Sequence, residues 1–362
     1  KGRCGKLETV PLDMPPGSEI ANMAVLGFDV KKVYQGRGVL EAASMGIELN
    51  ANDMAMRCNL VCIEDEKIKN HSAGHISNEE AHELIEALQN ELETDKIKFY
   101  PGVSYRHLLV LKDGKTNIDC TPPHDVPGTP FKDVMIRAKD EDTTTADILN
   151  NLIVRSQEIL KNHPVNKKRI AEGKDPGNSI WPWSPGNKPE MKTLQESYGI
   201  SGAMISAVDL LYGIGKYAGM KAIKVPGSTG LYNTNYEGKA KAAVDALQEV
   251  DLVYLHIEAS DEAGHEGDYE LKKKTIEYLD QRVVKYIMEE TEKMNEEIAI
   301  ALIPDHPTPC ELKTHTHDPV PFIIYHPGEE PDGVLYYNEE DTKEGFYGLL
   351  KGDEFIKKLL KQ

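Results

Sequence analysis

The sequence predicts an α/β fold, in which a mostly parallel sheet is sandwiched by helices and a smaller α+β domain is inserted. Three observations support this prediction. The 362 residues exceed the usual size of a single hydrophobic core. The C-terminal half alternates short apolar segments with segments of helical spacing. The region 47–189 lacks that alternation and is richer in proline, asparagine and charge.

Apolar segments bounded by turn residues predict the strands of the main domain, at 202–207, 221–225, 251–259, 297–304 and 320–326. Amphipathic spacing predicts the helices between them, at 208–219, 236–250 and 268–293. Such alternation is typical of right-handed βαβ units with parallel strands. In sheets of this kind, ligands bind beyond the carboxyl ends of the strands.

The region 47–189 is predicted to be the inserted domain, and residues 1–46 and 190–362 then form the main domain. Connections rich in glycine and proline flank the insert, at about 36–50 and 184–192. Both tryptophans lie in the insert, in "WPW". A lone "GRG" at 36–38 is too weak a signal to predict a nucleotide site.

Composition excludes several classes of function. With 40% hydrophobic and 28% charged residues, the chain has the composition of a globular protein, and no apolar run reaches the length of a membrane span. A net charge of −18 argues against nucleic-acid and acidic-membrane partners, because both need a basic surface. An anionic substrate would need a compact, partly buried cluster of basic residues. Five cysteines without regular spacing favour free thiols in a reducing, cytoplasmic compartment. The sequence predicts no oligomeric state.

Acidic and imidazole side chains follow two neighbouring predicted strands. Asp261 and His265 come after the first strand, Asp305 and His306 come directly after the next, and His315 follows in the same connection. We expect them to lie close together, because carboxyl ends of parallel strands share one edge. Carboxylate and imidazole ligands suit two divalent ions such as Mn²⁺ or Zn²⁺. The alternative is that these residues only cap turns and helices.

Ser18 lies in "PPGSEIANMAVLGFD", where a turn precedes a helical segment. One interpretation is an ordinary helix N-cap. The other is a nucleophile, because a helix N-terminus favours phosphate and a metal ion at the hydroxyl would activate it. The spacing leaves both open.

Several motifs together resemble the archaeal-type cofactor-independent phosphoglycerate mutases of the alkaline phosphatase superfamily. They are "PPGSEIANMAVLGFD", "GRG", "RCNLV", "DEAGHEGD" and "PDHPTPCELKTHTHDPVPF", and the similarity covers nearly the whole chain in order. The resemblance implies an alkaline-phosphatase-like domain interrupted by a smaller one. It also implies two divalent ions, Mn²⁺ first, with Zn²⁺, Mg²⁺ or Co²⁺ as alternatives.

By this resemblance, Ser18 is the nucleophile that becomes phosphorylated. Asp261, His265 and His315 would hold one metal, and Asp305 and His306 the other, with His317 as a less certain neighbour. The superfamily also uses an aspartate in an Asp-Gly turn after its first strand, and no such residue precedes Ser18. We expect that a preceding segment carries it.

The inserted domain is expected to supply groups that bind a small phosphorylated acid and close over it. Candidates for holding phosphate and carboxylate, or a substrate hydroxyl, are Arg57, Arg106, His107, His124 and Asp125. The run Lys167, Lys168 and Arg169 is either a further candidate or a solvated surface.

The expected reaction is the interconversion of 3-phosphoglycerate and 2-phosphoglycerate without 2,3-bisphosphoglycerate. Three alternatives remain open. "SAGHIS", "HPVNKKR" and "CTPPHD" resemble a bacterial branch of the family for which a homoserine kinase role is proposed. Phosphomonoester hydrolysis and a non-catalytic, metal-binding regulator are the others.

Overall fold

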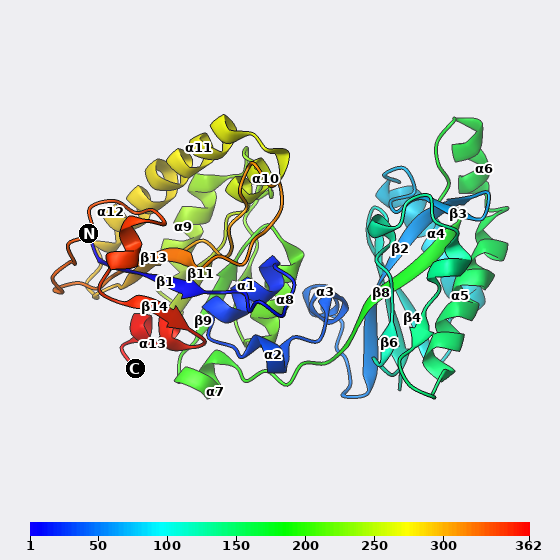
Figure 1. Ribbon diagram of the computed structural model, residues 1–362, viewed down its shortest axis with the longest axis horizontal. Helices are drawn as coiled ribbons and strands as arrows, with labels where there is room; N and C mark the ends of the chain where they lie inside the picture. The colour runs from blue at the N-terminus through cyan, green and yellow to red at the C-terminus, as the bar shows by residue number, and fades with distance from the viewer. The chain divides into compact units, whose positions relative to one another are not determined.

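The computed structural model describes all 362 residues, and they form two compact units (Figure 1). Unit 1 contains Lys1–Tyr34 and Glu190–Gln362, and unit 2 contains Gln35–Pro189. The second unit therefore begins earlier than the predicted residue 47. The reason is that helix α3 (Arg37–Ser44) packs on two strands of unit 2. None of the helices is both long and apolar enough to cross a membrane.

Unit 1 holds two separate sheets. The strands are β1 (Arg3–Glu8), β9 (Gly202–Ile205), β10 (Lys221–Ile223), β11 (Leu252–Leu255), β12 (Ile300–Leu302), β13 (Val320–Tyr325) and β14 (Gly348–Lys351). The first sheet has the order β10-β9-β11 and is parallel throughout. The second has the order β12-β13-β1-β14 and is mixed. All five predicted strands are present, each shorter than its apolar segment.

The mixed sheet corrects one expectation. Strand β13 was expected to join a mostly parallel sheet, but it runs antiparallel to both β12 and β1. Parallel neighbours need a crossover connection, usually a helix, that returns the chain to the other end of the sheet. The connection between β12 and β13 contains no helix, and the two strands are antiparallel. Strand β1 pairs in parallel with β14 on its other side.

The helices of unit 1 are α1 (Ser18–Val25), α2 (Val30–Val33), α7 (Leu194–Tyr198), α8 (Asp209–Tyr217), α9 (Tyr236–Ala246), α10 (Ala259–Glu266), α11 (Tyr269–Tyr278), α12 (Lys285–Thr291) and α13 (Glu354–Leu360). The single predicted helix 268–293 is α11 and α12, joined by a π-helical turn. Leu7, Phe322 and Phe355 pack in the core that β1, β13 and α13 share. This core fixes the strands whose connections carry the site.

Unit 2 is an α+β domain. Its strands are β2 (Asp53–Glu64), β3 (Lys67–Asn70), β4 (Ile97–Val103), β5 (Arg106–Lys112), β6 (Ile118–Asp119), β7 (Arg137–Ala138) and β8 (Ser179–Asn187). With α3, its helices are α4 (Asn78–Leu92), α5 (Thr144–Leu160) and α6 (Pro164–Ala171). Strand β2 is central and pairs antiparallel with β3, β5 and β8.

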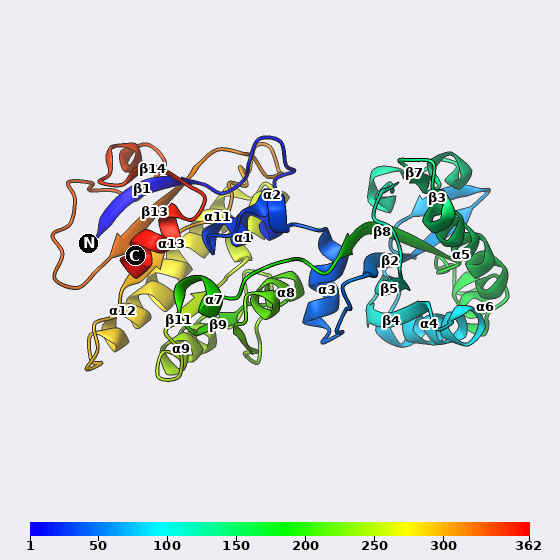
Figure 2. The same ribbon diagram turned by 90° about the horizontal axis from the view of Figure 1, so that it is seen from below.

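The five-stranded sheet of unit 2 has two unlike faces (Figures 1 and 2). Helices α4 and α5 cover one face, where Met56 and Cys58 of β2 join a core with Leu84 and Leu149. Because side chains alternate along a strand, Arg57 and Asn59 point to the opposite face. This second face, which we call the arginine face, also receives α3.

Candidate active site and metal centre

The residues predicted to carry chemistry in unit 1 come from three segments. Ser18 is the first residue of α1, after the extended N-cap Gly17. Asp261 lies in α10, which begins soon after β11. His306 and His315 lie in the connection between β12 and β13. The fold brings these three segments together.

The hydroxyl of Ser18 meets an imidazole. Ser18 Oγ lies 3.0 Å from His306 Nε2, and both residues are buried. Thr308 donates its hydroxyl proton to Asp261 and lies 3.3 Å from His306 Nδ1. The Thr308 oxygen therefore accepts the Nδ1 proton, and His306 Nε2 is left as the acceptor for Ser18. Burial also lowers the pKa of His306, which favours this neutral form.

His265, His315 and Asp261 form a cage beside that pair. Nδ1 of His265 lies 3.1 Å from the Lys313 carbonyl, and Nδ1 of His315 lies 3.2 Å from the Pro16 carbonyl. Each Nδ1 must carry a proton to make these bonds. The Nε2 atoms of both rings then face one another at 2.9 Å.

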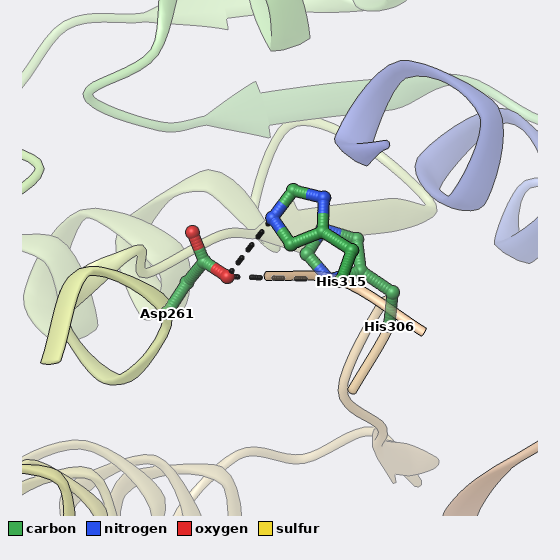
Figure 3. A group of neighbouring side chains, drawn as sticks. All are labelled: Asp261, His306 and His315. Carbon is green, nitrogen blue, oxygen red and sulfur yellow. Dashed lines mark ion pairs between the residues drawn. The ribbon is translucent and has the colours of Figure 1, made fainter. Parts of the chain in front are cut away.

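Asp261 faces the same space (Figure 3). Its carboxylate lies 3.4 Å from His315 Nε2 and 3.3 Å from His265 Nε2. Burial opposes its ionisation, but hydrogen bonds from His315 and Thr308 outweigh burial and lower the pKa of Asp261 to about 2. For His315, burial alone would lower the pKa. The hydrogen bond to the Asp261 carboxylate and its negative charge outweigh burial, so the pKa of His315 is raised. The Asp261 carboxylate and the two Nε2 atoms therefore converge on one point.

This donor set fits a divalent cation. One ligand atom from each of Asp261, His306 and His315 lies within 4.8 Å of the others. Converging lone pairs repel one another unless a proton or a metal ion lies between them. Imidazole nitrogen with carboxylate oxygen is a set that Zn²⁺ and Mn²⁺ accept.

Asp305 is held by a residue that the sequence analysis did not predict. Asn22 is fully buried, and its amide donates to Asp305 Oδ2 and to the Ser18 carbonyl, both at 2.8 Å. Tyr254 donates to the Asn22 side-chain oxygen at 2.6 Å. Asn22 thus ties the first turn of α1 to Asp305. The helical spacing between Ser18 and Asn22, which puts both on one side of α1, was the available signal.

His256 and Glu258, just after β11, were also missed. His256 Nε2 lies 3.3 Å from the Glu258 carboxylate and 3.9 Å from the Asp305 carboxylate, so the ring lies between two acidic groups. Burial and the charges of Asp305 and Asp261 raise the pKa of Glu258 to about 8. Lys239 of α9 is buried and donates to the His256 carbonyl, and burial lowers its pKa to about 8. His256 and Glu258 follow the end of strand β11, which is the same sequence signal that led to the prediction of Asp261.

His317 does not reach the cage. Its Nε2 lies 2.8 Å from the Met14 carbonyl, so it ties the β12–β13 connection to the loop before Ser18.

In unit 2, Arg57 and Arg106 both lie on the arginine face. Asn59 pairs with Arg106 in the β2–β5 ladder, so Arg106 faces the same way as Arg57. The Arg57 guanidinium lies 4.7 Å from the Trp183 ring and 3.0 Å from Glu41. His124 and Asp125 are exposed, and the His124 ring meets the edge of the same Trp183 at 5.2 Å.

His107 lies on the other face, contrary to its expected place beside the arginines. It pairs with Cys58, whose side chain is in the core under α4 and α5. Its Nδ1 accepts from the Gly102 amide, and burial lowers its pKa to about 3. The dipeptide Arg106-His107 necessarily splits between the two faces, because strand side chains alternate.

The basic residues of the "NKKR" run on α6 also have different surroundings, since two are exposed and one is buried. Lys167 and Lys168 are exposed on α6. Arg169 is buried, pairs with Glu80, and donates to the carbonyls of Ala73 and Asp175. Arg169 therefore stabilises unit 2.

Comparisons with known proteins identify the family of this chain. Residues 1–166 match the family model described as 2,3-bisphosphoglycerate-independent phosphoglycerate mutase. A protein of that name from Methanosarcina acetivorans is 52% identical over 100% of this chain and 90% of its own length. A solved Pyrococcus horikoshii structure, PH0037, is 28% identical with a TM-score of 0.82, over 99% of this chain and 86% of that one. The cofactor-independent phosphoglycerate mutase from Thermoplasma acidophilum is 27% identical with a TM-score of 0.69, over 99% and 88%. The chain belongs to the 2,3-bisphosphoglycerate-independent phosphoglycerate mutase family.

Proposed function

We propose that this protein interconverts 3-phosphoglycerate and 2-phosphoglycerate, without 2,3-bisphosphoglycerate, by metal-dependent phosphoryl transfer through Ser18. Membership of the family supports the reaction. The observation that carries the mechanism is the Ser18 hydroxyl, 3.0 Å from His306 Nε2 at the edge of the Asp/His cage. A serine in that position is oriented as a nucleophile.

Two divalent ions are part of the proposal. Asp261, His265 and His315 would hold one, and Asp305 and His306 the other. When bound, the ions supply positive charge that stabilises the oxygens of a phosphoryl group in transfer. Asn22 orients Asp305 through a hydrogen bond, and His256 lies 3.9 Å from the same carboxylate.

The reaction has two half-reactions. In the first, Ser18 Oγ forms a bond to phosphorus, and the bond from phosphorus to the glycerate oxygen breaks. Ser18 loses its proton and the leaving oxygen gains one, so the products are phosphoserine and glycerate. In the second, the other glycerate hydroxyl attacks the phosphoserine, and Ser18 Oγ is released and protonated again. The net change is an isomerisation.

Recognition of the substrate is assigned to unit 2. Arg57 and Arg106 present guanidinium groups suited to carboxylate or phosphate, and His124 with Asp125 offers partners for a hydroxyl. His107 has no part in this assignment, because it is buried on the other face.

The test is the product formed from 3-phosphoglycerate with Mn²⁺, followed by coupling 2-phosphoglycerate to enolase. Wild type should produce 2-phosphoglycerate, and acid quenching should trap phosphoserine at residue 18. Ser18→Ala should lose both signals. Ser197→Ala, at an exposed serine of α7, is the matched control and should keep both.

Other results would point elsewhere. Release of inorganic phosphate alone would indicate a phosphatase. Phosphorylation of homoserine from a phosphate donor, without mutase activity, would indicate the kinase alternative. Full turnover by Ser18→Ala would remove the nucleophile assignment.

A further inference from the structure

Thr308 lies in the connection between β12 and β13, shortly after His306, and it is buried. Two helices hold its backbone in place. Lys272 of α11 donates to the Thr308 carbonyl at 2.6 Å. Helix α10 lies so close that a Cβ at Gly264 would overlap the same carbonyl and lie 3.0 Å from Thr308 Cγ2. Only glycine permits this approach, and the position of the Thr308 side chain is therefore fixed.

The hydroxyl of Thr308 makes two hydrogen bonds with different directions. A threonine hydroxyl has one proton to donate and lone pairs to accept with. An aspartate is ordinarily ionised at neutral pH and only accepts, so the Thr308 proton goes to Asp261. The oxygen of Thr308 then accepts from His306 Nδ1, 3.3 Å away. With its proton on Nδ1, His306 keeps a free lone pair on Nε2, the nitrogen that faces Ser18.

The two partners of this hydroxyl come from different segments of unit 1. Asp261 lies in α10, whereas His306 lies in the β12–β13 connection. In the function proposed above, Asp261 belongs to the ligand set of one ion and His306 to that of the other. A ligand whose orientation is fixed by an outer hydrogen bond binds its metal ion more tightly. Consecutive hydrogen bonds also strengthen one another. Support for both ligand sets therefore passes through one oxygen atom.

We propose that Thr308 is a positioning residue for both metal sites at once. Its hydroxyl orients the Asp261 carboxylate in one ligand set and fixes the Nδ1-protonated form of His306 in the other. The assignment to two metal sites rests on the function proposed above, whereas the hydrogen bonds do not. Asn22 differs in this respect, because it bonds to Asp305 and so supports only one ligand set.

The first test is the position of the His306 proton in the metal-free protein. Nitrogen-15 NMR of labelled histidines reports it at about pH 8, above the ordinary imidazole pKa. The His306 signals are those that disappear in His306→Gln, and wild type should show a protonated Nδ1. Thr308→Val keeps the side-chain shape but has no acceptor, so an Nε2-protonated ring should appear. Thr308→Ser keeps the hydroxyl and should keep the wild-type pattern.

The second test is calorimetric titration of the metal-free protein with Mn²⁺. Thr308→Val should weaken the binding of both ions by about 10–100-fold. Thr308→Ser should weaken neither to that extent. Thr291→Val is the matched control, because Thr291 is also buried in unit 1 and donates to the Ile287 carbonyl of its own helix. It should leave both binding steps unchanged.

The outcomes separate this proposal from the proposed function. An Nδ1-protonated His306 in Thr308→Val, as in wild type, would overturn the role of the hydroxyl. Weakening of only one ion would overturn its service to both sites. The expected NMR patterns in a wild-type protein that binds no Mn²⁺ and forms no 2-phosphoglycerate would support the hydrogen bonds and contradict the proposed function. The NMR signals come from the folded protein, so a lower unfolding midpoint in Thr308→Val does not alter their interpretation.

Discussion

His265 and His315 face one another through their Nε2 atoms at 2.9 Å, while backbone carbonyls hold both Nδ1 protons. Two nitrogen lone pairs this close repel one another unless a proton or a cation lies between them, so a divalent ion bound there should stabilise the fold. At a Mn²⁺ concentration 100 times the dissociation constant, we expect a gain of about 2.7 kcal/mol in the free energy of unfolding. Chemical denaturation with and without Mn²⁺ measures it.

His315→Ala should reduce that gain, and EDTA should abolish mutase activity in wild type. His82→Gln, on α4 of unit 2, is the control and should retain the full gain. A Mn²⁺ response in His315→Ala equal to that of wild type would rule out the cage as a metal site.

Asn22→Ala should impair the site although Asn22 contacts no substrate. The substitution leaves Asp305 Oδ2 without its side-chain donor and the Ser18 carbonyl without a side-chain partner, while the His306 amide still donates to Asp305 Oδ1. Loss of such a supporting hydrogen bond typically reduces metal affinity or activity by about 10–100-fold. Titration with Mn²⁺ and the turnover number check this expectation. Tyr254→Phe removes only the hydrogen bond from Tyr254 to the Asn22 side-chain oxygen, so it should have a smaller effect.

Asn295→Ala is the matched control for Asn22, because Asn295 is exposed in unit 1. Wild-type Mn²⁺ affinity in Asn22→Ala would mean that Asp305 needs no support from α1.

Gly38→Ala should destabilise unit 2. Its Cβ would lie 2.6 Å from the Ala55 oxygen and 2.8 Å from Met56 Cα, and backbone atoms cannot move aside cheaply. Overpacking of this kind costs roughly 1–3 kcal/mol. Gly333→Ala, with nothing within 4 Å, is the control and should change the free energy of unfolding little. Urea unfolding of both variants makes the comparison, and equal stabilities would contradict the close packing of α3.

His107 should make the protein sensitive to acid. Burial lowers its folded pKa from 6.5 to about 3, so between these values the unfolded state binds a proton that the folded state does not. Stability therefore falls as pH falls from 6.5 towards 3, by at most about 1.4 kcal/mol per pH unit. His107→Asn keeps an acceptor for the Gly102 amide and removes the titration, so its stability should fall less steeply over this range.

The matched control is His163→Asn, since asparagine also caps α6 at that position. It should keep the wild-type slope in denaturation experiments at several pH values. An equally steep slope in His107→Asn would assign the acid sensitivity to other groups.

The sequence predicted correctly that acidic and imidazole side chains from two strand ends lie close together. Asp261 and Asp305 follow strands of the main domain, and strand ends are where α/β proteins gather ligands. The residues do lie close together, but β11 and β12 belong to different sheets, so the shared edge of one parallel sheet that we expected is not what positions the cage. The roles of its members as ligands remain predictions. The α/β class followed from the same alternation of strands and helices.

Other features needed three-dimensional information. The direction of β13 depends on the route of a connection without a helix, which no periodicity encodes. His107 was grouped with its neighbour Arg106 as a candidate, although the alternation of side chains along β5 puts the two on opposite faces. The hydrogen bond from Asn22 to Asp305 joins segments far apart in the sequence, so the helical spacing in α1 could not show which residue Asn22 would contact.

The interrupted path of unit 1 has a consequence for synthesis on the ribosome. Unit 2 is one continuous stretch, Gln35–Pro189, and can fold as soon as it has emerged. Strand β1 is made before unit 2 and must wait for its partners β13 and β14, which are made after unit 2. During that interval the apolar residues of the N-terminal segment stay exposed, and Ser18 has no imidazole beside it. The contact between Ser18 and His306 therefore forms only after the segment that follows β12 has been made.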